Sequence, residues 1–106
     1  MNKIKEILMK YRGKLEEESD RLALTNPNTI ADWKGRKRTV PCEIKVRTYM
    51  DDGVKKYSVS LEEKTLAILG GSSCGHMDED EAIQRVRFGL KRYCFEKKQY
   101  EQLTLF

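Results

Sequence analysis

Cysteine and histidine are the side chains of this sequence best suited to nucleophilic or metal chemistry. The chain has three cysteines and one histidine: Cys42, Cys74, Cys94 and His76. By number they could complete a tetrahedral zinc site. However, the chain contains no Cys-x-x-Cys pair, and Cys42 and Cys94 fall on predicted core faces, where a thiol behaves as a small apolar residue. Cys74 and His76 are close neighbours in a predicted loop, and such neighbours seldom face each other as a thiolate–imidazole pair must.

Acidic residues do not supply a catalytic pair either. Those at 16–18 and 78–81 fall at predicted helix-surface or helix-cap positions, where they have structural roles, and no two stand out as a general acid and base. The sequence therefore predicts no catalytic residue, no metal and no cofactor. We expect a protein that is not an enzyme.

Basic residues are the best candidates for binding nucleic acid. Residues 25–50 hold six bases against two acids, and the chain carries a net charge of +4. Lysine and arginine neutralise phosphates, and an aromatic ring can stack on an exposed base. We predict DNA or RNA contact by these residues: Trp33, Lys34, Arg36, Lys37, Arg38, Lys45, Arg47 and Lys56. In the alternative interpretation, the tryptophan fills the core and the bases are only solvated.

The last residues of the chain form a second binding candidate and read Gln102-Leu103-Thr104-Leu105-Phe106. They resemble the clamp-binding peptide of bacterial replication and repair proteins, which has Gln-Leu, a small or acidic residue, and then Leu-Phe. The resemblance covers five residues of 106, and Gln102, Leu103, Leu105 and Phe106 match. It implies that the Leu-Phe end enters an apolar pocket of the ring-shaped sliding clamp and Gln102 a polar pocket beside it. Alternatively, this apolar tail covers the domain's own core.

Length and composition favour one domain at residues 1–100, followed by a tail at 101–106. No apolar run approaches the roughly 20 residues that cross a bilayer, so we expect no membrane contact. Charges interrupt the apolar positions of the N-terminus, which therefore does not resemble a signal peptide. We expect a cytoplasmic protein with reduced cysteines.

The N-terminal segment has the periodicity of a helix. Six apolar residues form one stripe at 3.6 residues per turn: Ile4, Ile7, Leu8, Tyr11, Leu15 and Leu22. This stripe predicts a long helix that residues 25–28 end, because a residue before proline avoids the helical region.

Strands are predicted next. Residues 40–49 and 54–61 alternate apolar and polar side chains around a turn at residues 51–53, which predicts a hairpin. The apolar run 65–69 predicts a third strand, and residues 70–76 a loop. The face of this sheet without helices would carry Glu43, Lys45, Arg47, Tyr49 and Lys56.

A second helix is predicted from about Asp78 to Gln99, with Asp78 and Glu81 forming a capping box. Its buried stripe would be Ile83, Val86, Leu90, Tyr93 and Cys94. Phe88 and Phe95 lie a heptad apart on the opposite side, which indicates a surface that contacts a protein partner or the tail. The fold class is therefore α+β: a long helix, a three-stranded antiparallel sheet and a second helix, with both helices on one sheet face.

Two functions are consistent with these features. The first is a small accessory protein of DNA replication, DNA repair or a mobile element, recruited to the sliding clamp by its C-terminal peptide, with nucleic-acid contact by the basic residues. The alternative is a phage or mobile-element inhibitor that binds a host protein: a nuclease, a CRISPR-type defence complex or the clamp itself.

Overall fold

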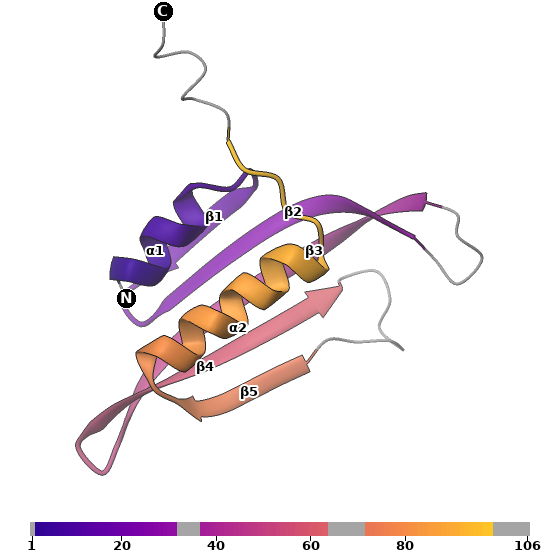
Figure 1. Cartoon of the computed structure of the whole chain (residues 1–106). Coiled ribbons are helices and arrows are strands. Elements are labelled where there is room, and N and C mark those ends of the chain that lie inside the picture. The colour runs from indigo at the N-terminus through magenta and orange to yellow at the C-terminus, as the bar shows by residue number, and fades with distance from the viewer. Residues whose placement is uncertain (1, 32–36, 64–71, 99–106) are drawn as a thin grey trace, which may run out of the picture.

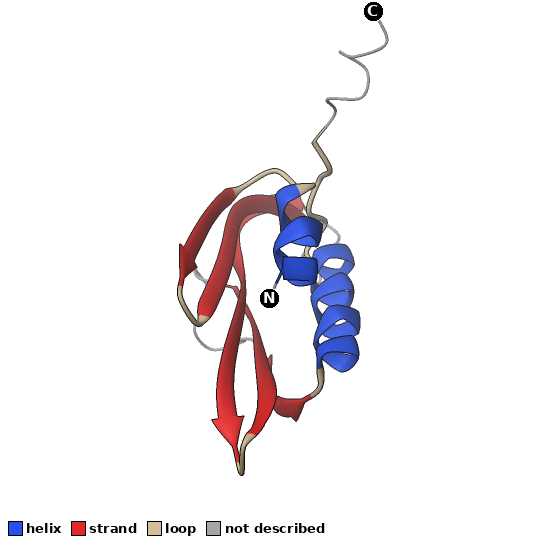
Figure 2. Ribbon diagram, turned by 90° about the vertical axis from the view of Figure 1, so that its left-hand side faces the viewer, coloured by secondary structure: helices blue, strands red, loops and turns tan. Residues whose placement is uncertain are grey.

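The computed structural model of the protein describes residues 2–31, 37–63 and 72–98, with side chains described in 2–27, 41–62 and 74–98. Five strands form one antiparallel sheet in the order β1-β2-β3-β4-β5 (Figure 1). Two helices lie together on one face of this sheet (Figure 2). The α+β class and the placement of both helices on one face agree with the prediction. The elements are α1 (Asn2–Met9), β1 (Lys14–Glu18), β2 (Arg21–Ala31), β3 (Lys37–Asp51), β4 (Val54–Glu63), β5 (Ser72–Met77) and α2 (Glu79–Arg92).

The predicted three-stranded sheet and long N-terminal helix are wrong. Helix α1 ends at Met9, and the chain turns at Gly13, whose φ is +139°. A β-carbon at Gly13 would lie 2.8 Å from the carbonyl oxygen of Thr25, so this close approach requires glycine. The residues beyond form the hairpin β1–β2, in which Leu22 and Leu24 are buried. These residues also fit the alternation of a strand, and they form a strand instead of a helix because β3 provides a hydrogen-bonding partner for β2.

The predicted loop at 70–76 is also wrong where the structure describes it, because Ser72–Met77 form β5. This strand pairs with β4, with Cys74 opposite Val59 and a register shift between Val59 and Tyr57. β5 has no apolar alternation of its own, so its hydrogen-bonding neighbour makes it a strand. The predicted strand at 65–69 lies outside the described residues.

The hairpin of β3 and β4 confirms the prediction. Asp51 pairs with Val54, and the two turn residues, Asp52 and Gly53, both have positive φ, at 49° and 77°. This is the backbone of the two-residue turn that matches the twist of paired strands. The predicted inward side chains of both strands are buried: Cys42, Ile44, Val46, Tyr57, Val59 and Leu61.

Helix α2 begins as predicted and ends earlier. The Asp78 side chain accepts from the backbone N–H of Glu81, and the Glu81 side chain accepts from that of Asp78, which completes the capping box. At the other end, Cys94 has φ +54°, and the N–H of Phe95 donates to the carbonyl of Leu90 at 2.9 Å. This left-handed ending is the Schellman motif, which glycine usually occupies. Cys94 is exposed rather than buried, so its predicted core position is wrong.

Strands β2 and β3 continue together beyond the strands on either side. Within the described residues, β1 pairs with β2 as far as Thr25, and β4 pairs with β3 as far as Cys42. β2 and β3 stay paired up to the gap in the described residues. Residues 27–31 and 37–41 therefore form a two-stranded arm that projects from the sheet (Figure 1).

Two prolines mark the base of this arm. Pro27 and Pro41, the two prolines of the chain, are cross-strand partners. The two-residue turn makes Asp51 a hydrogen-bonded partner of β4, and such pairs recur at every second residue. Counting back from Asp51 in steps of two reaches position 41, where the backbone N–H of β3 would point toward β4. Proline occupies this position and has no N–H to donate. Pro27 stands in the equivalent position toward β1, so neither proline can donate a hydrogen bond outward to a third strand.

Candidate binding surfaces

The last described residues, 96–98, are anchored beside the end of α1. Tyr11 and Lys97 form an isolated antiparallel bridge. On either side of it, backbone hydrogen bonds of 2.7 and 2.8 Å join residues 10–12 to residues 96–98. The backbone of Lys98 is therefore held by the domain.

The predicted clamp-binding residues Gln102, Leu103, Leu105 and Phe106 lie outside the described residues. The sequence still limits their position, because residues 99–101 alone separate Lys98 from Gln102. An extended chain advances at most about 3.5 Å per residue, so Gln102 starts within roughly 14 Å of Lys98. The peptide is thus tied closely to the domain.

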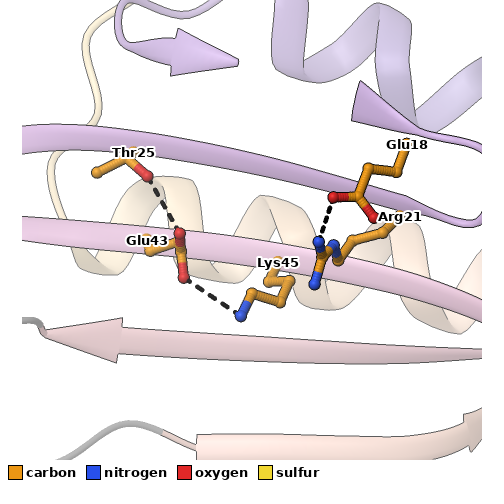
Figure 3. A network of polar contacts seen from close by, with 5 residues as sticks. All are labelled: Glu18, Arg21, Thr25, Glu43 and Lys45. Atoms are coloured by element: carbon orange, nitrogen blue, oxygen red, sulfur yellow. Dashed lines mark hydrogen bonds and ion pairs between the residues drawn. The ribbon is translucent and has the colours of Figure 1, made fainter. Parts of the chain in front are cut away.

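The sheet face without helices, called the open face below, carries a network of polar contacts (Figure 3). Thr25 Oγ1 donates to Glu43 Oε2 at 3.2 Å, and Lys45 Nζ lies 3.7 Å from Glu43 Oε1. Nearby, the guanidinium of Arg21 donates to Glu18. The contacts Lys45–Glu43 and Arg21–Glu18 each place a carboxylate beside a base. The negative carboxylates therefore offset much of the positive charge of Lys45 and Arg21.

A hollow of about 130 Å³ lies beside this network on the open face. Ala23 is too small to fill the space between its longer neighbours. Three carboxylates and two bases surround it, which leaves the lining with net negative charge and does not favour phosphate. The lining residues are Glu16, Glu18, Arg21, Ala23, Glu43 and Lys45.

The structure divides the predicted nucleic-acid residues into groups. Three lie outside the described residues: Trp33, Lys34 and Arg36. Two lie at the start of β3, in the arm: Lys37 and Arg38. The other three alternate in sequence with buried residues and so lie on the open face, as predicted: Lys45, Arg47 and Lys56.

These groups do not form one patch. Lys45 lies seven positions after Arg38 on the same continuous strand, which at about 3.3 Å per residue is roughly 23 Å. On the open face, Arg47 and Lys56 make no ion pair with any described residue. The prediction overlooked Arg21, which lies opposite Arg47 across β2 and β3. Arg21 precedes the alternating buried residues Leu22 and Leu24, and this alternation could have indicated that Arg21 lies on the open face.

The two predicted contact phenylalanines differ in environment. Phe88 on α2 is 51% exposed, and the Arg85 guanidinium lies 5.0 Å from the centre of its ring. Phe95 follows the end of α2 and is only 7% exposed, packed in the core cluster. The prediction that Phe95 lies exposed on the polar side of a helix is therefore wrong, because the left-handed turn at Cys94 redirects the chain.

The cysteines and the histidine do not converge. Cys42 is buried, Cys74 half-buried and Cys94 exposed, and all three are free thiols. His76 is exposed, with Nδ1 3.7 Å from Asp51 Oδ2. Within the described ranges, no group of three or more His, Cys, Asp or Glu side chains is placed to hold a metal ion.

Tyr57 joins the sheet to the start of α2. Its hydroxyl donates to Glu79 Oε2 at 3.3 Å. Burial raises the pKa of Tyr57 above its ordinary value, and the negative charge of Glu79 raises it further. Both effects disfavour the phenolate, so this contact is a structural hydrogen bond of a neutral tyrosine.

Comparisons with protein-family models, with curated proteins and with solved structures found no match for this chain. The two helices of the described part are each too short and too polar to cross a bilayer.

Proposed function

We propose that this is a small cytoplasmic binding protein that acts in DNA replication, DNA repair or on a mobile element. Its C-terminal peptide recruits it to a bacterial sliding clamp, and its basic residues contact nucleic acid. The observation that carries the proposal is the match of Gln102, Leu103, Leu105 and Phe106 to the clamp-binding pattern at the end of the chain.

The end of the domain is compatible with such a peptide. Lys98 is held against residues 10–12, so the last eight residues of the sequence follow a point that is fixed on the domain. The alternative, a tail that folds back on the domain, was expected to cover Phe88 and Phe95, and of these Phe88 is 51% exposed. Phe95 already belongs to the core cluster of the domain, so it needs no cover from the tail.

Fluorescence anisotropy or calorimetry tests the proposal by measuring the binding of the purified chain to a purified bacterial sliding clamp. Leu105→Ala/Phe106→Ala is expected to weaken binding more than about tenfold, because two large apolar side chains would leave their pocket. Thr104→Ala is the matched control, since the pattern leaves that position variable, and it should bind like the unaltered chain.

Thermal melting distinguishes the two roles of the tail. If the tail is available to the clamp, deletion of residues 102–106 should abolish clamp binding and leave the melting temperature unchanged. A large fall in melting temperature would make the tail a structural element and would overturn the proposal, as would failure of the intact chain to bind any bacterial clamp.

The second candidate function is inhibition of a host protein by a phage or mobile-element product. Phe88 favours it, because an aromatic ring 51% exposed beside Arg85 is the kind of side chain that dominates protein interfaces. Capture of a nuclease or defence complex from host lysate by the tail-deleted chain, and its loss in Phe88→Ala, would favour this function over the first.

A further inference from the structure

The arm, residues 27–31 and 37–41, is the part of the molecule best shaped to enter a groove. In the described part of the chain, each of its strands is paired only with the other. Pro27 and Pro41 keep a third strand from adding at its base, because neither can donate a backbone hydrogen bond outward. Among the residues that the structure describes, the arm is therefore a two-stranded ribbon with no third strand paired to either edge.

The dimensions of the arm match the major groove of B-form DNA. That groove is about 12 Å wide and 8.5 Å deep and admits a two-stranded ribbon. Paired strands lie about 4.8 Å apart, and five residues of strand extend roughly 16 Å. The two strands of the arm are thus narrow enough and long enough to lie in the groove.

The charge of the arm also suits a polyanion. Its ten residues include Lys37 and Arg38 and no acid. The open face, in contrast, carries a hollow with more carboxylates than bases, and Glu43 and Glu18 offset Lys45 and Arg21. Phosphate attraction is therefore stronger at the arm than over that hollow.

We propose that the arm binds in the major groove of duplex DNA, with Lys37 and Arg38 supplying phosphate contacts. This inference rests on the proposed nucleic-acid contact and names its ligand and its place in the fold. Duplex RNA fits poorly, because its major groove is too narrow for side chains to read. A ribbon held by two such contacts predicts weak binding without sequence preference, with a dissociation constant on the order of 10–100 μM at physiological salt.

The test uses the full-length chain and three labelled probes of the same sequence: duplex DNA, single-stranded DNA and duplex RNA. Anisotropy titrations over a series of salt concentrations should show the tightest binding to duplex DNA. Lys37→Gln/Arg38→Gln should weaken that binding and reduce the slope of log affinity against log salt by about 2, since each lost phosphate contact contributes about 0.9. The single variants should each reduce it by about 1.

Lys91→Gln/Arg92→Gln is the matched control, because it removes the same charge from two exposed residues of α2. It should bind duplex DNA like the unaltered chain. Equal weakening by the two double variants would assign binding to net charge and overturn the proposal. Absence of duplex binding, or equal or tighter binding of the single strand or duplex RNA, would overturn it as well. Melting curves of all variants should coincide, since surface changes of this kind alter stability by less than about 0.5 kcal/mol.

The two proposals fail separately. Deletion of residues 102–106 should leave duplex DNA binding unchanged, and Lys37→Gln/Arg38→Gln should leave clamp binding unchanged. If the intact chain binds duplex DNA but no clamp, only the role of the tail is contradicted, whereas if it binds the clamp but no duplex DNA, only the role of the arm is contradicted.

Discussion

Gly89 of α2 and Leu61 of β4 are in direct contact across the core. A β-carbon at Gly89 would lie 2.5 Å from Leu61 Cδ2 and 3.4 Å from Ile44 Cδ1. Leu61 is 1% exposed, so its side chain has no room to withdraw. Glycine normally weakens a helix interior by about 1 kcal/mol relative to alanine. Here it allows the helix to lie close to the sheet.

Gly89→Ala is therefore expected to destabilise the protein although alanine favours helices. Overpacking of a tight core costs about 1–3 kcal/mol, against a gain of about 1 kcal/mol in helix propensity. Urea denaturation should show a net loss of about 1 kcal/mol. Gln84→Ala, at an exposed position of the same helix, is the control and should be neutral or slightly stabilising. A Gly89→Ala variant more stable than the unaltered chain would contradict this packing.

Cys94→Gly is expected to stabilise the end of α2. Cys94 adopts φ +54°, a left-handed conformation that costs a residue with a β-carbon about 1 kcal/mol. The gain should be smaller than this figure, because glycine is also freer in the unfolded chain. Cys94→Ala removes the thiol but keeps the β-carbon, so it should give no gain. Equal stability of the two variants in thermal melting would argue against backbone strain.

Phe95→Ala and Phe88→Ala should differ sharply in stability. Truncation of the buried Phe95 is expected to cost about 3–5 kcal/mol through lost burial and a cavity. Truncation of the half-exposed Phe88 should change stability by less than about 1 kcal/mol. Chemical denaturation of both variants measures the difference. A comparable loss in the two would mean that Phe88 also packs within the fold.

Tyr57 makes stability depend on alkaline pH. Because its pKa is raised in the folded state, the folded protein holds the phenol proton more tightly than the unfolded chain does. Its contribution is complete below the ordinary tyrosine pKa of about 10 and falls as the pH rises through the raised value. Tyr57→Phe should therefore lose less stability than the unaltered chain between neutral and strongly alkaline pH.

Glu79→Gln provides the control for that measurement. It removes the negative charge beside the phenol and leaves the burial of Tyr57 in place. Its alkaline loss of stability in denaturation experiments should be intermediate. An unchanged pH profile in Tyr57→Phe would assign the alkaline loss to other groups.

Sequence alone determined the elements whose local signals agree with their surroundings. The β3–β4 hairpin followed from alternating side chains and from Asp52 and Gly53, which suit a turn with positive φ. The start of α2 followed from Asp78 and Glu81, whose capping contacts are local. The clamp-like tail and the basic run were also recognised as short sequence patterns. The pairing of the two strands that form the arm was not predicted.

Tertiary structure decided the elements whose local patterns were ambiguous. Leu15 and Leu22 satisfied a helical stripe as well as they satisfy strands, and contact with β3 and the closeness of Gly13 to Thr25 selected strands. β5 had no pattern of its own and became a strand by pairing with β4. Cys94 gave no signal for a left-handed turn because glycine normally marks that position. The physical reason is the same in each case: backbone hydrogen bonds and burial with distant segments outweigh propensities of about 1 kcal/mol per residue.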